Sequence, residues 1–352
     1  MSQEEVLKKL EERKEKLGFF DKYLPVWVVL CIIIGLFLSQ LVPGIGNFID
    51  DLQIAGISIP IGICLFLMMY PAMLNVQFSE IKKLGRNPTP IILTLISNWL
   101  IAPFVGLLMA NLFLVDEQLI VAIILLSSSP CTAMVLVWGW LAKGNQEQNV
   151  ITTSINTITI IIGYVPLVSF LTGIQNIPID WVQLLISAGT FIGLPLILGV
   201  ISRYVLVDFK GREWFNDIYK PAVGKLSIIA LLFTLIILFS LNGEVLITNP
   251  DLMLIISIPL LVGFAIVVGV NVFITKVVNL DYPEAIITVI IGSSSHFEIA
   301  IAVAVGLYGV GSIAALGTTM GLFWEVPVML SVVYLGRFLG KKGFWKDKRK
   351  ET

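Results

Sequence analysis

The sequence Ser127-Ser-Ser-Pro-Cys-Thr (residues 127–132) is echoed later in the chain by Ser293-Ser-Ser-His-Phe-Glu (residues 293–298). Each stretch interrupts a long run of apolar residues. Three consecutive hydroxyl side chains compete for the backbone hydrogen bonds of a helix, and a proline such as Pro130 removes one of those bonds. The pair therefore predicts two helices that are broken at matched positions. At membrane depth, such breaks are tolerated only inside protein or beside an aqueous cavity.

The composition identifies the apolar runs as membrane spans. Hydrophobic residues make up 57% of the 352 positions and charged residues 13%, whereas soluble proteins are about 25% charged. A spanning helix needs roughly 20 apolar residues, and the alternation over about ten residues that marks a membrane barrel is missing. We therefore expect an all-α polytopic membrane protein with ten transmembrane helices at 24–42, 59–76, 90–115, 119–141, 151–171, 181–207, 222–241, 252–275, 285–308 and 312–335.

The distribution of lysine and arginine predicts the topology. All 23 of them lie in the N-terminal segment, in every second loop with the span ends beside it, and in the C-terminal tail. Cytoplasmic loops carry the excess of these residues, so we expect a multi-pass plasma membrane protein with both termini in the cytoplasm. Two inverted five-helix repeats follow, 23–172 and 173–340, between a cytoplasmic N-terminal segment (1–22) and a cytoplasmic basic tail (341–352).

The overall charge and the residue counts exclude other classes of protein. The formal net charge is −1, so the basic surface that nucleic acid binding requires is not expected. One histidine and three cysteines rule out a histidine-rich metal site and a disulfide framework. The expected partners are the lipid bilayer and a transported solute.

Two acidic residues, Glu298 and Glu325, lie deep in the predicted spans. A charge at the bilayer centre costs about 2.5–3.5 kcal/mol on insertion scales, and the sequence places no lysine or arginine at that depth. Each carboxyl group should therefore favour its neutral form and exchange a proton, which makes both candidates for proton coupling. A protonated Glu325 can instead simply link two helices through a hydrogen bond.

The interrupted segments also supply groups that can contact a solute. Cys131 follows Pro130 at the break, where a thiol can act as a soft ligand. His296 is either a contact or a neutral imidazole packed against polar neighbours, and the serines are either contacts or small residues packed between helices. The predicted substrate-binding residues are Cys131, Ser127, Ser128, Ser129, Thr132, Ser293, Ser294, Ser295 and His296.

Several motifs resemble those of the arsenical-resistance arsenite efflux permeases, within the bile acid, arsenite and riboflavin transporter superfamily. The resemblance covers about residues 23–340. It rests on Phe66-Leu-Met-Met-Tyr-Pro, Asn98-Trp-Leu-Ile-Ala-Pro-Phe, Ser129-Pro-Cys-Thr-Ala-Met-Val, Trp138-Gly-Trp, Phe297-Glu-Ile-Ala-Ile-Ala-Val-Ala and Glu325-Val-Pro-Val-Met.

This resemblance implies a panel and a core domain, with discontinuous helices four and nine that cross at the centre. It further implies efflux of arsenite, and in some members of antimonite, by proton antiport without a cofactor. The essential cysteine of the family, which meets arsenic(III), corresponds to Cys131, and its essential glutamate corresponds to Glu298. The sequence departs from the family pattern at His296, where asparagine is usual.

Two other functions remain open at this point. A sodium-coupled symporter of an organic anion, like the bile acid branch, can use oxygen ligands from Glu298, Asn98, Thr132 and the serines. An intramembrane hydrolase can use Cys131 or a serine as nucleophile with His296 and Glu298. Sodium dependence of transport distinguishes the first, and hydrolysis of an ester or peptide the second.

Overall fold

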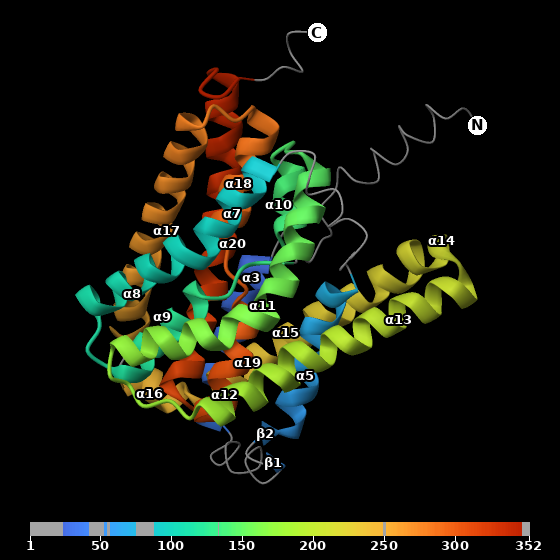
Figure 1. The fold of residues 1–352 in the computed structure, drawn as a ribbon. Helices are drawn as coiled ribbons and strands as arrows, with labels where there is room; N and C mark the ends of the chain where they lie inside the picture. Colours follow the sequence, from blue (N-terminus) through green and yellow to red (C-terminus); the bar gives the residue numbers. More distant parts are fainter. Residues whose placement is uncertain are drawn as a thin grey trace.

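The computed structural model describes residues 24–41, 53–54, 57–74, 88–132, 134–248 and 251–346. These residues form a bundle of helices, with a small antiparallel hairpin of β1 (Gln53–Ile54) and β2 (Ile57–Ser58) at one end (Figure 1). This confirms the all-helical class. The predicted N-terminal segment 1–22 and the basic tail beyond residue 346 lie outside the described residues.

Each predicted span coincides with a helix or with a pair of helices. Six segments are apolar and long enough to cross a bilayer: Pro88–Phe113, Gln146–Ile174, Trp181–Lys210, Arg212–Leu241, Asp251–Val277 and Ile313–Lys341. They contain α7 (Pro88–Ile96) and α8 (Ala102–Phe113), α11 (Gln146–Ile174), α12 (Trp181–Ala188) and α13 (Leu194–Lys210), α14 (Arg212–Trp214) and α15 (Lys220–Leu241), α17 (Asp251–Val277), and α20 (Ile313–Lys341).

Shorter helices account for the other four runs. They are α3 (Leu24–Leu41), α5 (Ile59–Met73), the pair α9 (Glu117–Ser127) and α10 (Val135–Leu141), and the pair α18 (Tyr282–Ser293) and α19 (Phe297–Tyr308); a short α16 (Gly243–Thr248) follows α15. The chain is therefore an integral membrane protein with several apolar spans, and the two predicted broken helices are divided where the serine clusters occur.

Three spans contain one wide π-helical turn each, at η2 (Ser97–Ile101), η3 (Gly189–Gly193) and η4 (Phe215–Tyr219). A proline follows each of them, in the first turn of the next helix: Pro103, Pro195 and Pro221. Proline has no N–H to donate and its ring crowds the preceding turn, which explains the local widening.

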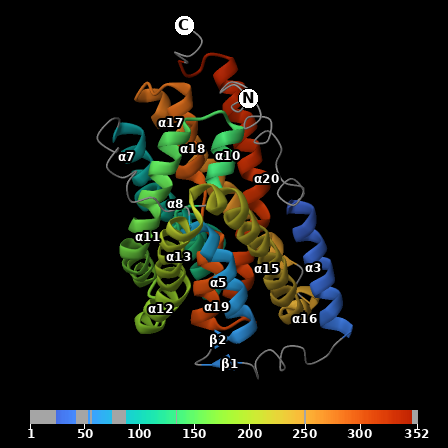
Figure 2. The same cartoon turned by 90° about the vertical axis from the view of Figure 1, so that its right-hand side faces the viewer.

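The helices pack in two groups, as Figure 2 shows. In the first group α15 packs against α3 and α5, and α5 also contacts α13. In the second group α8, α9, α17, α18, α19 and α20 pack against one another, with α10 and α11 on α18. Both broken helices belong to the second group and reach the first through contacts of α19 with α5 and α12.

The basic residues in three connections gather at one end of the bundle. The turn between α10 and α11 contains Lys143, α17 ends with Lys276 in its last turn, and α20 ends at Lys341. Figure 2 places these three connections at the upper end, whereas β1, β2 and the start of α12 lie at the lower end. The structure thus separates these basic residues from the loop that contains Asp180 at the start of α12.

Candidate functional site

The first break separates α9 from α10. Helix α9 ends at Ser127, whose hydroxyl donates to the Ile124 carbonyl at 3.3 Å. The Ser129 hydroxyl donates to the Leu126 carbonyl at 2.9 Å. These side chains satisfy carbonyl groups that a continuing helix would have used, and Pro130 offers no N–H to replace them. The break predicted from this sequence is confirmed.

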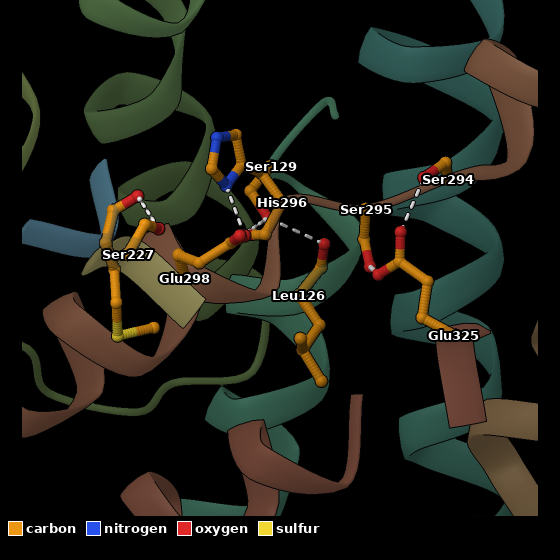
Figure 3. A network of polar contacts seen from close by, with 9 residues as sticks. Leu126, Ser129, Ser227, Ser294, Ser295, His296, Glu298 and Glu325 are labelled. Atoms are coloured by element: carbon orange, nitrogen blue, oxygen red, sulfur yellow. Dashed lines mark hydrogen bonds and ion pairs between the residues drawn. The ribbon is translucent and has the colours of Figure 1, made fainter. Parts of the chain in front are cut away.

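The second break, between α18 and α19, has no proline. Ser294 is extended, with φ −100° and ψ 141°. Its hydroxyl donates to Oε1 of Glu325 at 2.5 Å, and the Ser295 hydroxyl donates to Oε2 at 3.0 Å (Figure 3). The Glu325 side chain comes from α20 and is 2% exposed. A buried acid on a neighbouring helix thus binds both serines in the segment where α18 ends.

The two breaks pair with each other. Pro130 and Ser295 form an isolated antiparallel β-bridge. The backbone N–H of His296 donates to the Ser129 carbonyl at 2.7 Å, and the Ser129 hydroxyl donates to the His296 carbonyl at 3.2 Å. Helix α9 packs against α19, and α10 packs against α18. The ends of α9 and α18 and the starts of α10 and α19 therefore meet at one crossover, defined here as residues 127–132, 134–135 and 293–298.

Asparagines inside the bundle hold both sides of the crossover. Asn156 on α11 donates to the Cys131 carbonyl at 3.2 Å, and Asn98 in η2 donates to the Asn156 side-chain oxygen at 3.3 Å. Asn271 on α17 donates to the Ser293 hydroxyl at 3.0 Å. Sequence reasoning missed Asn156 and Asn271, although an asparagine within an apolar span is a visible signal because its amide must find a partner there.

The thiol of Cys131 is buried in the crossover. Cys131 is 3% exposed, and its neighbour Thr132 and the nearby Ser128 are buried as well. Within the part of the chain that the structure describes, the hydroxyls of Ser128 and Thr132 have no hydrogen-bond partner. Buried hydroxyls without partners are uncommon, so these two retain the capacity to bind a small polar solute.

His296 and Glu298 approach each other at the start of α19. The His296 Nδ1 atom lies 2.8 Å from Oε2 of Glu298, with side-chain exposures of 1% and 15% (Figure 3). His296 precedes the helix with φ −100° and ψ 79°, so its ring can turn back toward the first helical turn. In Figure 3, Glu298 and Glu325 lie on opposite sides of Leu126 and Ser129. The two predicted acids thus lie on different sides of the crossover.

A pocket with an empty volume of about 590 Å³ adjoins the crossover, between α8, α9, α17, α18 and α20. Five of the predicted substrate-binding residues line it: Ser127, Ser129, Ser293, Ser294 and Ser295. Apolar side chains such as Phe264 and Leu260 form much of the remaining wall. Cys131, His296 and the two acids do not line this pocket, so the predicted site residues divide into those that line the pocket and those that lie outside it.

Close packing at the end of α9 gives a first prediction. A Cβ atom on Gly106 would lie 2.3 Å from Oγ and 2.4 Å from Cβ of Ser127. Gly106→Ala should therefore destabilise the protein by about 1–3 kcal/mol, as overpacking of a core does. A lower melting temperature in detergent is the measurement. Gly173→Ala is the control, since its Cβ would meet nothing within 4 Å; equal melting temperatures would contradict the packing argument.

Comparison with known proteins extends over most of the chain. Residues 62–249 match the Sodium Bile acid symporter family. The arsenical-resistance protein Acr3 of Alkaliphilus metalliredigens is 37% identical, covering 90% of this chain and 92% of that protein. Acr3 of Corynebacterium glutamicum is 32% identical over 94% and 92%, and an uncharacterized transporter of Synechocystis is 37% identical over 96% and 93%.

These matches confirm the resemblance seen in the motifs. The family is one of transporters, and the relatives match along nearly their whole length. The protein is therefore a transporter and not an enzyme, which removes the hydrolase from the alternatives. The chain belongs to the Sodium Bile acid symporter family.

Proposed function

We propose that this protein exports arsenite from the cytoplasm by proton antiport and thereby confers arsenic resistance. The observation that carries the proposal is the pairing of the two helix breaks. The first break contains Cys131, and the second is followed directly by the acid Glu298. Two relatives that match nearly the whole chain are named arsenical-resistance proteins. Antimonite, whose chemistry is close to that of arsenite, is a second candidate substrate.

We place the protein in the plasma membrane with ten spans in two inverted five-helix repeats. Both termini then lie in the cytoplasm. The matched breaks in spans four and nine support the repeat, because inverted repeats of secondary transporters place broken helices at corresponding positions. The separation of Lys143, Lys276 and Lys341 from the opposite loops supports the orientation.

Cys131 is the proposed contact for arsenic. Neutral As(OH)3 exchanges one hydroxyl for the thiol sulfur: the S–As bond forms, and the hydroxyl leaves as water with the thiol proton. Water reverses the step on the outer side. One thiol binds arsenic weakly enough for release, whereas three thiolates would retain it. Hydroxyls of Ser128 and Thr132, which have no partner among the described residues, can bind the remaining hydroxyls of arsenite.

The pocket serines extend this proposed path. Each hydroxyl of Ser127, Ser129 and the 293–295 cluster that donates to a protein oxygen keeps lone pairs that can accept from an arsenite hydroxyl. Because Cys131 is 3% exposed, arsenite reaches the thiol only after the surrounding helices move apart. Such a movement fits the two packing groups, which contact each other through α19 and α20.

Glu298 is the proposed proton-coupling residue, with Glu325 as a second one. Protonation of Glu298 from outside favours the state that returns inward, so the proton gradient drives arsenite outward. Glu325 binds Ser294 and Ser295 through both carboxyl oxygens, so its protonation state bears directly on the break of span nine. The flux assay below, applied to Glu325→Gln, tests that role.

Arsenite flux in proteoliposomes, measured with imposed pH gradients and with sodium present or absent, tests the proposal. Antiport predicts flux that follows the pH gradient and is unchanged by sodium. Sodium-dependent uptake of an organic anion, without arsenite flux, would instead identify the alternative symporter. That alternative is supported by the family match and by the oxygen atoms at the crossover, which are suitable sodium ligands.

A further inference from the structure

The surroundings of the His296 ring are unusual for a buried polar side chain. His296 is the single histidine of the chain and is 1% exposed. Its backbone N–H and carbonyl are both bonded to Ser129, which fixes the position from which the ring projects. Among the described residues, the ring nitrogens have no aligned hydrogen bond. The Nδ1 atom nevertheless lies 2.8 Å from the Glu298 carboxyl group.

We propose that His296 and Glu298 hold the coupling proton jointly, as one two-site unit. The inference rests on the proposed proton antiport and adds a second residue to it. The proton resides on the carboxyl group or on the imidazole, and in the second case a cation lies beside a carboxylate. Both forms have the same proton count and no net charge, which limits the cost of burying the unit.

The two sites strengthen the binding of the first proton. When two interacting groups share a proton, the affinity of the empty unit is the sum of the microscopic affinities of both sites. An asparagine in place of His296 leaves only the carboxyl group, so the empty unit binds this first proton more weakly. The histidine also allows a second proton to bind at lower pH, which a lone carboxyl group cannot do.

Few other groups compete for this role. Near the middle of the elements around the crossover, the titratable side chains are Glu325, Cys131, Cys64 on α5 and Tyr164 on α11. Both carboxyl oxygens of Glu325 accept hydrogen bonds from Ser294 and Ser295. Helices α5, α10 and α12 carry no charged residue. The charged residues of the other packed helices lie near helix ends: Glu117, Glu147, Asp251, Lys276, Glu284, Arg337 and Lys341.

Titration of the single histidine by NMR tests the pair without any transport. The full-length protein, labelled at histidine and reconstituted in nanodiscs, gives one imidazole signal whose pH midpoint can be followed. Glu298→Gln should displace that midpoint, since it removes the carboxylate whose Oε2 lies 2.8 Å from the Nδ1 atom of the ring. Glu117→Gln, which changes an exposed residue at the start of α9, should leave it in place. Equal midpoints in all three proteins would overturn the pairing.

A pH profile of arsenite flux tests the consequence for transport. His296→Asn and His296→Gln should both move the alkaline limb of the profile to lower pH, because the unit then loses its proton earlier. A purely structural role would scale the rate and leave the profile in place, which would overturn the inference. Wild-type flux that does not respond to pH would overturn the proton antiport itself, and the NMR titration would still decide whether the two side chains share a proton.

Discussion

Cys131→Ser should abolish arsenite export. A hydroxyl in place of the thiol keeps the overall shape of the side chain but removes the sulfur that bonds to arsenic. We expect the initial rate of arsenite accumulation in energised everted vesicles to fall by more than about tenfold, which corresponds to about 1.4 kcal/mol. Accumulation equal to that of the wild type would contradict the role assigned to Cys131.

The chain offers a matched control for this substitution. Cys64 is half-buried in α5, outside the crossover, and Cys31 is buried in α3. Cys64→Ser should retain arsenite accumulation close to the wild-type level. Comparable amounts of folded protein in the membrane, measured for both variants, separate a lost contact from lost folding. A similar loss in both variants would show that serine substitution disturbs the bundle in general.

Glu298→Gln should eliminate concentrative transport. The amide has nearly the same shape as a protonated carboxyl group but cannot release a proton, so the variant cannot couple arsenite exit to proton entry. Everted vesicles that contain it should accumulate arsenite no more than vesicles without the protein, and arsenite should no longer cause proton movement. The same assay with Glu117→Gln provides the control. A Glu298→Gln protein that concentrates arsenite against its gradient is incompatible with the coupling proposed above.

The break of span four was predictable because its causes are local. Ser127 and Ser129 bond to carbonyls within three residues, and Pro130 is visible in the sequence. The break of span nine was predicted from its three serines and from its match to span four, without a proline. Its serines donate to Glu325, which lies 31 and 30 residues further along the chain, so their partner depends on how α20 packs. Sequence reasoning named Glu325 and both serines, but not the hydrogen bonds between them.

The sequence also did not predict which of the site residues line the pocket and which lie outside it. Residues only two positions apart, such as Ser129 and Cys131, differ in surroundings, because an irregular segment turns neighbouring side chains in different directions. Both are buried, but Ser129 lines the pocket, whereas Cys131 lies outside it and its carbonyl accepts from Asn156. Spacing arguments assume a regular helix, and the helical period does not apply where α9 has ended.

The opposed helix ends of the crossover bear on the energy source for export. Two N-termini, of α10 and α19, and two C-termini, of α9 and α18, meet there. Each end carries roughly half an elementary charge, positive or negative, so the four contributions nearly cancel. Such a place suits uncharged As(OH)3. Exchange of a neutral molecule for a proton moves one positive charge inward, so the membrane voltage assists export by about 2.3 kcal/mol per 100 mV for each proton. A cell with little pH gradient but a maintained voltage would still expel arsenite.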